Sequence, residues 1–251
     1  MLRRDSNARY SPSGESTGFR NWQNNMSPPK KQAMPAVYDP ALALYLPLWI
    51  MDAPGFAARD AYGHLATRSG AVWAPQGHKL DGVDDYLTVP DSPALRPSQV
   101  TLAICIKPTG THPAAGRIVE KFWGGAPTYA SYILRWDHVN PDKISFDIGY
   151  AGGYTACLST TITFNDRWTH VAGTYDRANL RIYVNGLLET TVAQTAAMIY
   201  TTGLLNIGRL ESAPGYEFNG IVSEVHVYSK ALSAIEVMQH YQSARRRMPW
   251  L

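Results

Sequence analysis

Hydrophobic and polar residues alternate along most of the chain after about residue 42, in short segments separated by turn residues. In residues 100–108 every second side chain is a large aliphatic one. Residues 180–184 repeat this pattern ahead of Asn185-Gly186, a pair typical of a tight hairpin turn. About a dozen such segments follow one another. A period of two is typical of strands that bury one face, so we expect two packed antiparallel sheets.

One segment near the C-terminus has a helical period instead. Ser233 is followed three residues later by Glu236, which is the spacing of a capping box. Apolar residues then recur at helical spacing from Ile235 through Met238 to Tyr241 or Gln242. The sequence therefore predicts one short helix that packs on the sandwich through this face.

Residues 1–36 have a different composition, rich in Ser, Asn, Gly and Pro, and show neither period. Such a segment cannot form a core, so we expect an extended arm at residues 1–36, one domain at 37–244 and a short basic tail at 245–251. Four large apolar side chains along the arm would be buried if it lay in a groove of a neighbouring subunit. These are Tyr10, Phe19, Trp22 and Met26.

Composition and charge narrow the class of protein. With 45% hydrophobic and 17% charged residues, the chain has enough apolar surface for a core. The longest apolar run, residues 42–51, is too short to span a bilayer, and the N-terminus lacks the apolar core of a secretory signal. Both ends carry a net positive charge and the body between them is mildly acidic, and no basic stripe with interleaved aromatics crosses the body. We therefore expect no membrane span and no nucleic-acid binding by the domain.

The chain has two cysteines, Cys105 and Cys157. Two are too few for a disulfide framework or a cysteine metal cluster. We expect both to be buried as small hydrophobic side chains, with a disulfide bridge as the alternative.

Several ordered motifs resemble those of the laminin-G-like, concanavalin A-type jelly-roll superfamily. The resemblance implies an all-β fold, a two-sheet antiparallel jelly-roll sandwich with one short C-terminal helix and, here, an extended N-terminal arm. Because this fold carries lectins, adhesion modules, toxin domains, hydrolases and virion proteins, the resemblance implies the fold more than the function. The matching segments are LWIMDAPGFAARDAYGH (48–64), LDGVDDYLTV (80–89), WTHVAGTYD (168–176), LRIYVNG (180–186), LNIG (205–208) and residues 218–237.

The motifs also predict structural roles. Trp168, Val171 and Tyr175 are suited to the core between the sheets, where large aromatic side chains bury the most area. His170 lies between apolar neighbours and is expected to be a hydrogen-bonded structural histidine. Gly220 is expected where the last strand passes close to another backbone.

The resemblance to glucanases raises the question of hydrolysis. Those relatives carry a carboxylate pair on one strand, in a pattern such as E-x-D-x-x-E. The nearest match here keeps Glu224 but has His226 in place of the middle aspartate and has no second glutamate. One carboxylate cannot supply both nucleophile and acid, so we expect no enzyme activity. Glu224 is expected to be a strand-end residue that ties down a neighbouring loop.

Three aspartates, Asp81, Asp84 and Asp85, surround Gly82 directly ahead of a strand-like run. Asp-Gly and Asp-Asp pairs are ordinary turn chemistry, because the carboxylates accept backbone N–H groups. The alternative is a structural calcium ion on the rim of the sandwich, which would use the same carboxylates as ligands. We favour the turn, and no other cofactor is predicted.

Glycan recognition would require aromatic side chains as stacking platforms with polar partners. Glycine-bearing and polar loops place four aromatic residues in suitable positions. For Trp123 the alternative is that it covers a sheet edge or packs on another subunit. The candidates are Trp123, Tyr129, Trp136 and Tyr154.

These features together favour a non-catalytic structural or binding module. The narrower prediction is a bacteriophage virion protein, a capsid decoration or tail-associated component, whose arm grips other virion proteins or copies of itself. The alternative is a lectin-like carbohydrate-binding or adhesion module, extracellular or on a cell surface, with a cell-surface glycan as its partner. A glycoside hydrolase is disfavoured by the missing carboxylate.

Overall fold

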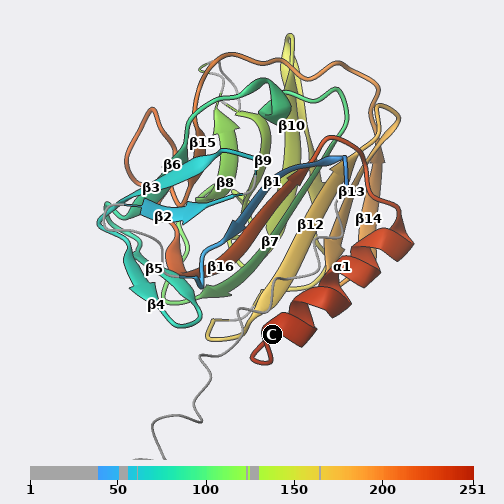
Figure 1. Ribbon diagram of the computed structural model, residues 1–251. Coiled ribbons are helices and arrows are strands. Elements are labelled where there is room, and N and C mark those ends of the chain that lie inside the picture. Colours follow the sequence, from blue (N-terminus) through green and yellow to red (C-terminus); the bar gives the residue numbers. More distant parts are fainter. Residues whose placement is uncertain (1–38, 51–55, 61, 123, 125–129, 164) are drawn as a thin grey trace, which may run out of the picture. The chain divides into compact units, whose positions relative to one another are not determined.

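The computed structural model describes residues 39–50, 56–60, 62–122, 124, 130–163 and 165–251. Residues 39–251 belong to one compact unit. They form two antiparallel sheets and one C-terminal helix, which confirms the predicted fold class (Figure 1). The arm side chains Tyr10, Phe19, Trp22 and Met26 lie outside the described residues.

The first sheet has the strand order β14-β13-β12-β7-β16-β5-β4, and β1 also pairs with β16. The last strand, β16, therefore lies at the centre of this sheet, between β7 and both β5 and β1. The strands are β1 (Leu42–Pro47), β4 (Val72–Ala74), β5 (Gly77–Asp81), β7 (Val100–Pro108), β12 (Thr169–Tyr175), β13 (Asn179–Val184), β14 (Leu187–Ala193) and β16 (Asn219–Tyr228).

The second sheet has the order β11-β10-β9-β8-β15-β6-β3-β2. A short 3-10 helix, Pro93–Leu95, and the helix α1, Ala234–Arg247, complete the fold. The strands are β2 (Phe56–Arg59), β3 (Leu65–Ser69), β6 (Tyr86–Val89), β8 (Arg117–Phe122), β9 (Ala130–Trp136), β10 (Ile144–Tyr150), β11 (Gly153–Leu158) and β15 (Leu205–Ile207).

The core lies between the sheets and follows the predicted alternation. Val171 and Tyr175 are fully buried in it, as expected. Trp168 is only half-buried and packs against Trp250, with 6.3 Å between ring centroids, so its predicted place in the core is wrong. It precedes β12 and lies at the end of the sandwich, where the chain after α1 covers it. Cys105 and Cys157 are buried free thiols, which confirms that prediction.

Gly220 allows two backbones to approach closely, as the sequence suggested. Its φ is +146°, and a Cβ atom at this position would lie 2.4 Å from the carbonyl oxygen of Lys107 on β7. Only glycine fits without moving one of the strands.

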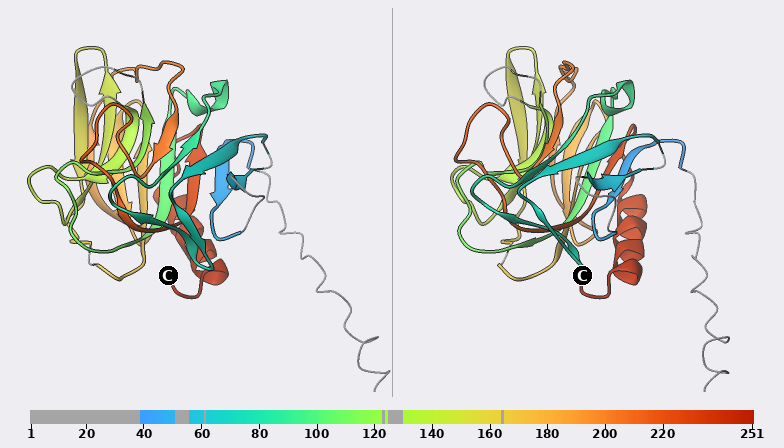
Figure 2. Two further views of the ribbon diagram at one scale, coloured as in Figure 1. Left: turned by 90° about the vertical axis from the view of Figure 1, so that its left-hand side faces the viewer. Right: turned by 60° about the vertical axis from the view of Figure 1, so that its left-hand side comes forward.

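The helix α1 lies against the outside of the first sheet (Figures 1 and 2). Its capping box forms, with Ser233 Oγ accepting from the backbone N–H of Glu236 and the Glu236 carboxylate accepting from that of Ser233. The backbone N–H of Ser233, followed by Lys230, lowers the pKa of Glu236 to about 2. The predicted start of the helix is therefore confirmed.

The predicted contact face of α1 is partly wrong. Ile235 is 72% exposed, whereas Val237 and Ala244 are buried. Side chains two positions apart in the sequence point in directions about 200° apart around a helix. The face that buries Val237 therefore turns Ile235 toward solvent. The predicted basic tail is corrected as well, because Arg247 still belongs to the helix and Met248 is buried.

Candidate functional site

The outer face of the second sheet carries a row of polar side chains that the strand register brings together. Residues that face each other across a ladder project their side chains to the same side. Ile133, which lies in this row, is outside the core cluster, whereas Tyr132 and Leu134 belong to it, so this side is the outer one. Across the sheet the row runs Asp147, Ile133, Glu120, Asn206, Thr88 and Thr67, and all but Ile133 are polar; we call it the polar row.

One half of the polar row is sealed and centres on Glu120. Its Oε2 atom lies 3.2 Å from Nε of Arg117, and its Oε1 atom accepts the backbone N–H of Glu211 at 3.1 Å. Burial raises the pKa of Glu120 to about 7, against the opposing effect of Arg117. The backbone N–H of Arg117 also donates to Tyr216 at 2.7 Å, so the chain between β15 and β16 covers this half.

The second carboxylate of the sealed half is Asp147. Its Oδ2 atom accepts from Nε of Arg135 at 2.6 Å, and its Oδ1 atom accepts from the hydroxyl of Ser145. Burial raises the pKa of Asp147, with Arg135 opposing the shift. Both carboxylates are thus buried, hydrogen-bonded and paired with an arginine, which is how proteins hold charges away from water.

We expect Glu120 to make stability fall as the pH rises. A raised pKa means that the folded state retains a proton that the unfolded state releases above its ordinary value of 4.5. The stabilisation is complete below that value and is lost as the pH passes about 7. A difference of about 2.5 pKa units corresponds to about 3 kcal/mol.

The measurement compares the protein with its Glu120→Gln variant by urea unfolding. The difference between their free energies of unfolding should change by about 3 kcal/mol between about pH 4 and pH 8. The native protein should become less stable relative to the variant as the pH rises. Other titrating groups are common to both proteins and cancel. A difference that is the same at both pH values would contradict the assignment.

The other half of the polar row runs from the buried Asn206 through the half-buried Thr88 to the exposed Thr67. The Arg209 guanidinium lies 3.6 Å above the ring centroid of Tyr86, and its Nε donates to Asn206 Oδ1 at 3.2 Å. Asn206 Nδ2 donates in turn to Glu211 Oε2 at 2.9 Å. Each side chain is thereby held in place by the next one. We call Thr67, Thr88, Tyr86, Arg209 and Glu211 the Arg209 patch; all five are exposed or half-buried.

The sequence interpretation missed both halves of this face. Glu120 lies in RIVEKF, a strand that also carries Arg117 and Lys121, and Asp147 is the charged residue of ISFDIGY; all are buried in strands. That pattern is a signal in itself, because a buried charge requires a partner. The two lie on either side of Ile133 in the register, and only strand pairing reveals that they share one face.

The four predicted stacking residues differ in their exposure to solvent and in whether the structure describes them. Trp136 is 0% exposed and stacks on His112, with centroids 4.0 Å apart, and on Phe218, so its prediction as a glycan platform is wrong. It continues the inward alternation of β9, which turns its ring into the core. Tyr154 is 37% exposed, beside Gly149 in the β10–β11 hairpin. Trp123 and Tyr129 lie outside the described residues.

The three aspartates around Gly82 make the hydrogen bonds of a turn. Asp81 Oδ1 accepts the backbone N–H of Val83 at 2.9 Å, and Asp85 Oδ2 accepts that of Asp81 at 3.0 Å. The bond from Val83 is the main cause that lowers the pKa of Asp81, while burial and then Asp81 raise that of Asp85. One oxygen from each of Asp81, Asp84 and Asp85 lies within 4.8 Å of the others. A rim calcium ion at these carboxylates stays a prediction.

Glu224 lies on the first sheet, far from a strand end. It is 0% exposed in the middle of β16, and both its oxygens accept from Arg247 of α1 at 3.1 Å. Glu224 therefore holds helix α1 in place from the middle of a strand. This corrects the prediction that it is a strand-end residue that fixes a loop.

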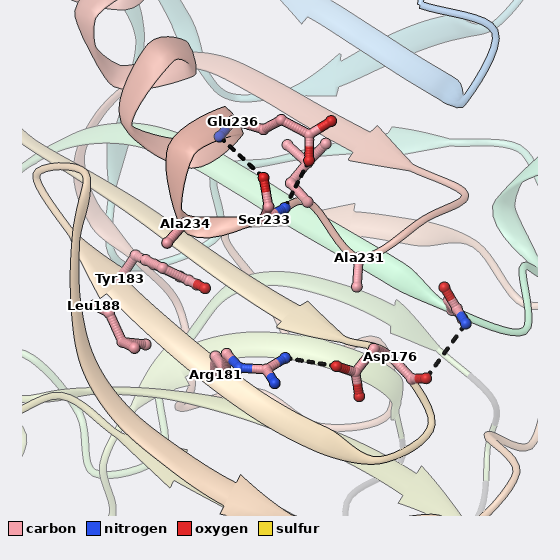
Figure 3. Close-up of a pocket in the computed structure, with 10 residues that line it drawn as sticks. Asp176, Arg181, Tyr183, Leu188, Ala231, Ser233, Ala234 and Glu236 are labelled. Atoms are coloured by element: carbon pink, nitrogen blue, oxygen red, sulfur yellow. Dashed lines mark hydrogen bonds and ion pairs between the residues drawn. The ribbon is translucent and has the colours of Figure 1, made fainter.

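A pocket of about 390 Å³ lies where β13 and β14 meet the segment before α1 (Figure 3). Its charged groups already have partners in the chain. Arg181 donates to Asp176 at 2.6 Å, and Glu236 belongs to the capping box with Ser233. These groups stabilise a turn and a helix start, so the outer face of the second sheet is the better candidate for ligand binding.

None of the helices in the described part of the chain is long and apolar enough to cross a membrane. No curated protein matches the chain. Solved structures, in contrast, match most of it.

Domain 4 of AbnA, a GH43 extracellular arabinanase from Geobacillus stearothermophilus in complex with arabinotriose, has a TM-score of 0.61 at 15% identity, covering 79% of this chain and 97% of that one. A mutant sialidase of Trypanosoma rangeli has a TM-score of 0.64 at 16% identity, covering 83% of this chain and 33% of that one. The receptor binding domain of botulinum neurotoxin D has a TM-score of 0.63 at 13% identity, covering 81% of this chain and 52% of that one. At these identities the likeness shows the fold alone.

The sequence itself decides the family. The profile described as the concanavalin A-like lectin/glucanases superfamily matches residues 81–238, which is most of the sandwich and the start of α1. The chain therefore belongs to the concanavalin A-like lectin/glucanase superfamily.

Proposed function

We propose that this protein is a non-catalytic carbohydrate-binding module that binds its ligand at the Arg209 patch. The observation that carries the proposal is the hydrogen-bonded series from Arg209 through Asn206 to Glu211, with the Arg209 guanidinium 3.6 Å from the centroid of the Tyr86 ring. A pre-ordered guanidinium beside threonine hydroxyls suits a ligand rich in hydroxyl groups, because little side-chain freedom is lost on binding. The structural likeness to an arabinanase domain in complex with arabinotriose supports the ligand class.

The absence of catalysis is also part of the proposal. A retaining or inverting glycosidase needs two carboxylates that reach the sugar from a cleft. Here Glu120 and Asp147 are buried, and each is bonded to an arginine. Their arrangement suits a structural network beneath the binding face. Incubation with arabinan, xylan and sialyllactose should release no sugar; turnover that Glu120→Gln abolishes would contradict this.

The binding test uses the full chain and an immobilised panel that includes arabinotriose, xylotriose and sialyllactose. Arg209→Ala should weaken binding to whichever glycan is retained by roughly ten-fold or more, since a hydrogen bond to a charged group contributes about 1.5–3 kcal/mol. Arg245→Ala is the matched control, because Arg245 also lies over a tyrosine ring, that of Tyr241, but on α1 against the first sheet. Equal affinities of the two variants, or no retained glycan, would overturn the proposal.

The narrower prediction of a virion component, with the arm as its contact, rests on Tyr10, Phe19, Trp22 and Met26 outside the described residues. A carbohydrate-binding module suits either predicted location. It serves a virion protein that contacts a cell-surface glycan as well as an extracellular adhesion protein.

A further inference from the structure

The interface between α1 and the first sheet contains a cluster of histidines around Glu224. Glu224 and His226 are two residues apart on β16, so both side chains project from the same face of the sheet. His240 reaches this face from α1, and its ring centroid lies 4.3 Å from that of His226. Three potential ligand side chains from β16 and α1 therefore meet at this interface, where Glu224 and His226 are buried and His240 is half-buried.

The distances suit a single small ion. One ligand atom from each of Glu224, His226 and His240 lies within 4.8 Å of the others. In a tetrahedral zinc site with bonds of about 2.0–2.1 Å, ligand atoms are separated by roughly 3.3 Å. The limit of 4.8 Å exceeds this separation, so the three side chains would have to draw together by up to about 1.5 Å to hold an ion.

Three histidine ring nitrogens at this interface are buried without a hydrogen-bond partner among the described residues. They are Nδ1 of His226, Nε2 of His240 and Nδ1 of the neighbouring His170. Buried polar atoms are normally bonded, and an unbonded one is costly. An imidazole nitrogen without a hydrogen bond has a lone pair or an N–H group unused, and in the tautomer with the lone pair there it can coordinate a metal ion.

His170 on β12 holds the ring of His240 in place. Its Nε2 atom lies 3.0 Å from Nδ1 of His240, and its backbone N–H donates to Asn185 Oδ1 at 3.0 Å. In the tautomer in which His240 Nδ1–H donates to His170, the lone pair of His240 lies on Nε2. A metal-binding histidine ordinarily donates its other ring N–H to a neighbour in this way.

Glu224 supplies the negative charge. Arg247 donates to both of its oxygens at 3.1 Å, and the thiol of Cys105 lies 3.7 Å from Oε1. A carboxylate offers about four lone-pair positions, and besides Arg247 and Cys105 the hydroxyl of Tyr45 lies against Glu224, so an ion would take the place of one of these contacts.

We propose that Glu224, His226 and His240 form a site for one transition-metal ion of the zinc type, which fastens α1 to the first sheet. Two imidazoles with one carboxylate are a ligand set that zinc accepts, with a fourth position for water. The site lies on the sheet opposite the Arg209 patch and is independent of the proposed glycan binding.

The test adds Co²⁺ and then Zn²⁺ to the full chain after treatment with a chelator. One equivalent of Co²⁺ should produce the intense visible absorption of a tetrahedral site, and one equivalent of Zn²⁺ should displace it and raise the Tm. His226→Ala and His240→Gln should lose the absorption and the shift in Tm. His138→Ala is the matched control, because this histidine side chain is 60% exposed and should leave both unchanged.

Two results would overturn the proposal. The first is a native protein that binds no stoichiometric Co²⁺, or shows only octahedral spectra; this measurement needs no variant and decides the matter even if both variants fail to fold. The second is binding that folded His240→Gln retains or that His138→Ala abolishes, which would place the ion on the surface.

Discussion

Replacing Trp136 by alanine is expected to lower the free energy of unfolding by about 3–5 kcal/mol. Trp136 is among the largest fully buried side chains, and it stacks on His112 and Phe218 between the sheets. Alanine would remove this apolar contact and leave a cavity that the rigid strands around it cannot fill. Urea unfolding followed by circular dichroism measures the loss.

Two further variants separate a core residue from a ligand platform. Trp136→Phe fills most of the space and should cost less than Trp136→Ala while leaving glycan affinity unchanged. Tyr154 is an exposed residue of the β10–β11 hairpin, so Tyr154→Ala should change the free energy of unfolding by less than about 1 kcal/mol. A weaker affinity in folded Trp136→Phe would show that the ring reaches a ligand after all.

Replacing Arg247 by methionine is expected to lower the free energy of unfolding by about 3–5 kcal/mol, because it leaves a buried carboxylate without its counter-charge. Glu224 is fully buried, and Arg247 contacts both of its oxygens from the last turn of α1. Methionine retains most of the length and apolar character of the arginine side chain, so the effect reports mainly on the charge. The measurement is urea unfolding at neutral pH in the presence of a chelator.

Arg246→Met is the matched control for this effect. Arg246 is the preceding residue of the same helix, is exposed, and donates to Ser243 in the same turn. Its replacement should change stability by less than about 0.5 kcal/mol. Equal losses in the two variants would mean that the residues after 244 behave as the solvated basic tail that the sequence suggested.

Local patterns in the sequence were sufficient to predict the architecture. Alternation along residues 100–108 and the Asn185-Gly186 turn specify strands and a hairpin, and both are present in β7, β13 and β14. Ser233 and Glu236 specify the start of α1 because a capping box depends on residues only three apart. The ordered motifs added the family and therefore the two-sheet arrangement.

The candidate sites depend on contacts between segments that are distant along the chain. Alternation predicts that Trp136 faces one side of β9, but only packing decides that this side is the core. Glu120 and Asp147 lie on either side of Ile133 because three strands pair in one particular register, and no local signal specifies a register.

The sequence by itself determined the strands, the turns, the start of the helix and the family, because each depends on neighbouring residues or on an ordered motif. The tertiary structure decided which face of α1 is buried, and thereby that Glu224 and His226 meet His240 and Arg247. The physical reason is that the hydrophobic effect is non-directional: it favours the burial of apolar surface but does not specify which surface packs against which. Several faces of a short helix satisfy it almost equally, and the choice among them depends on the shape and charge of the sheet against which the helix packs.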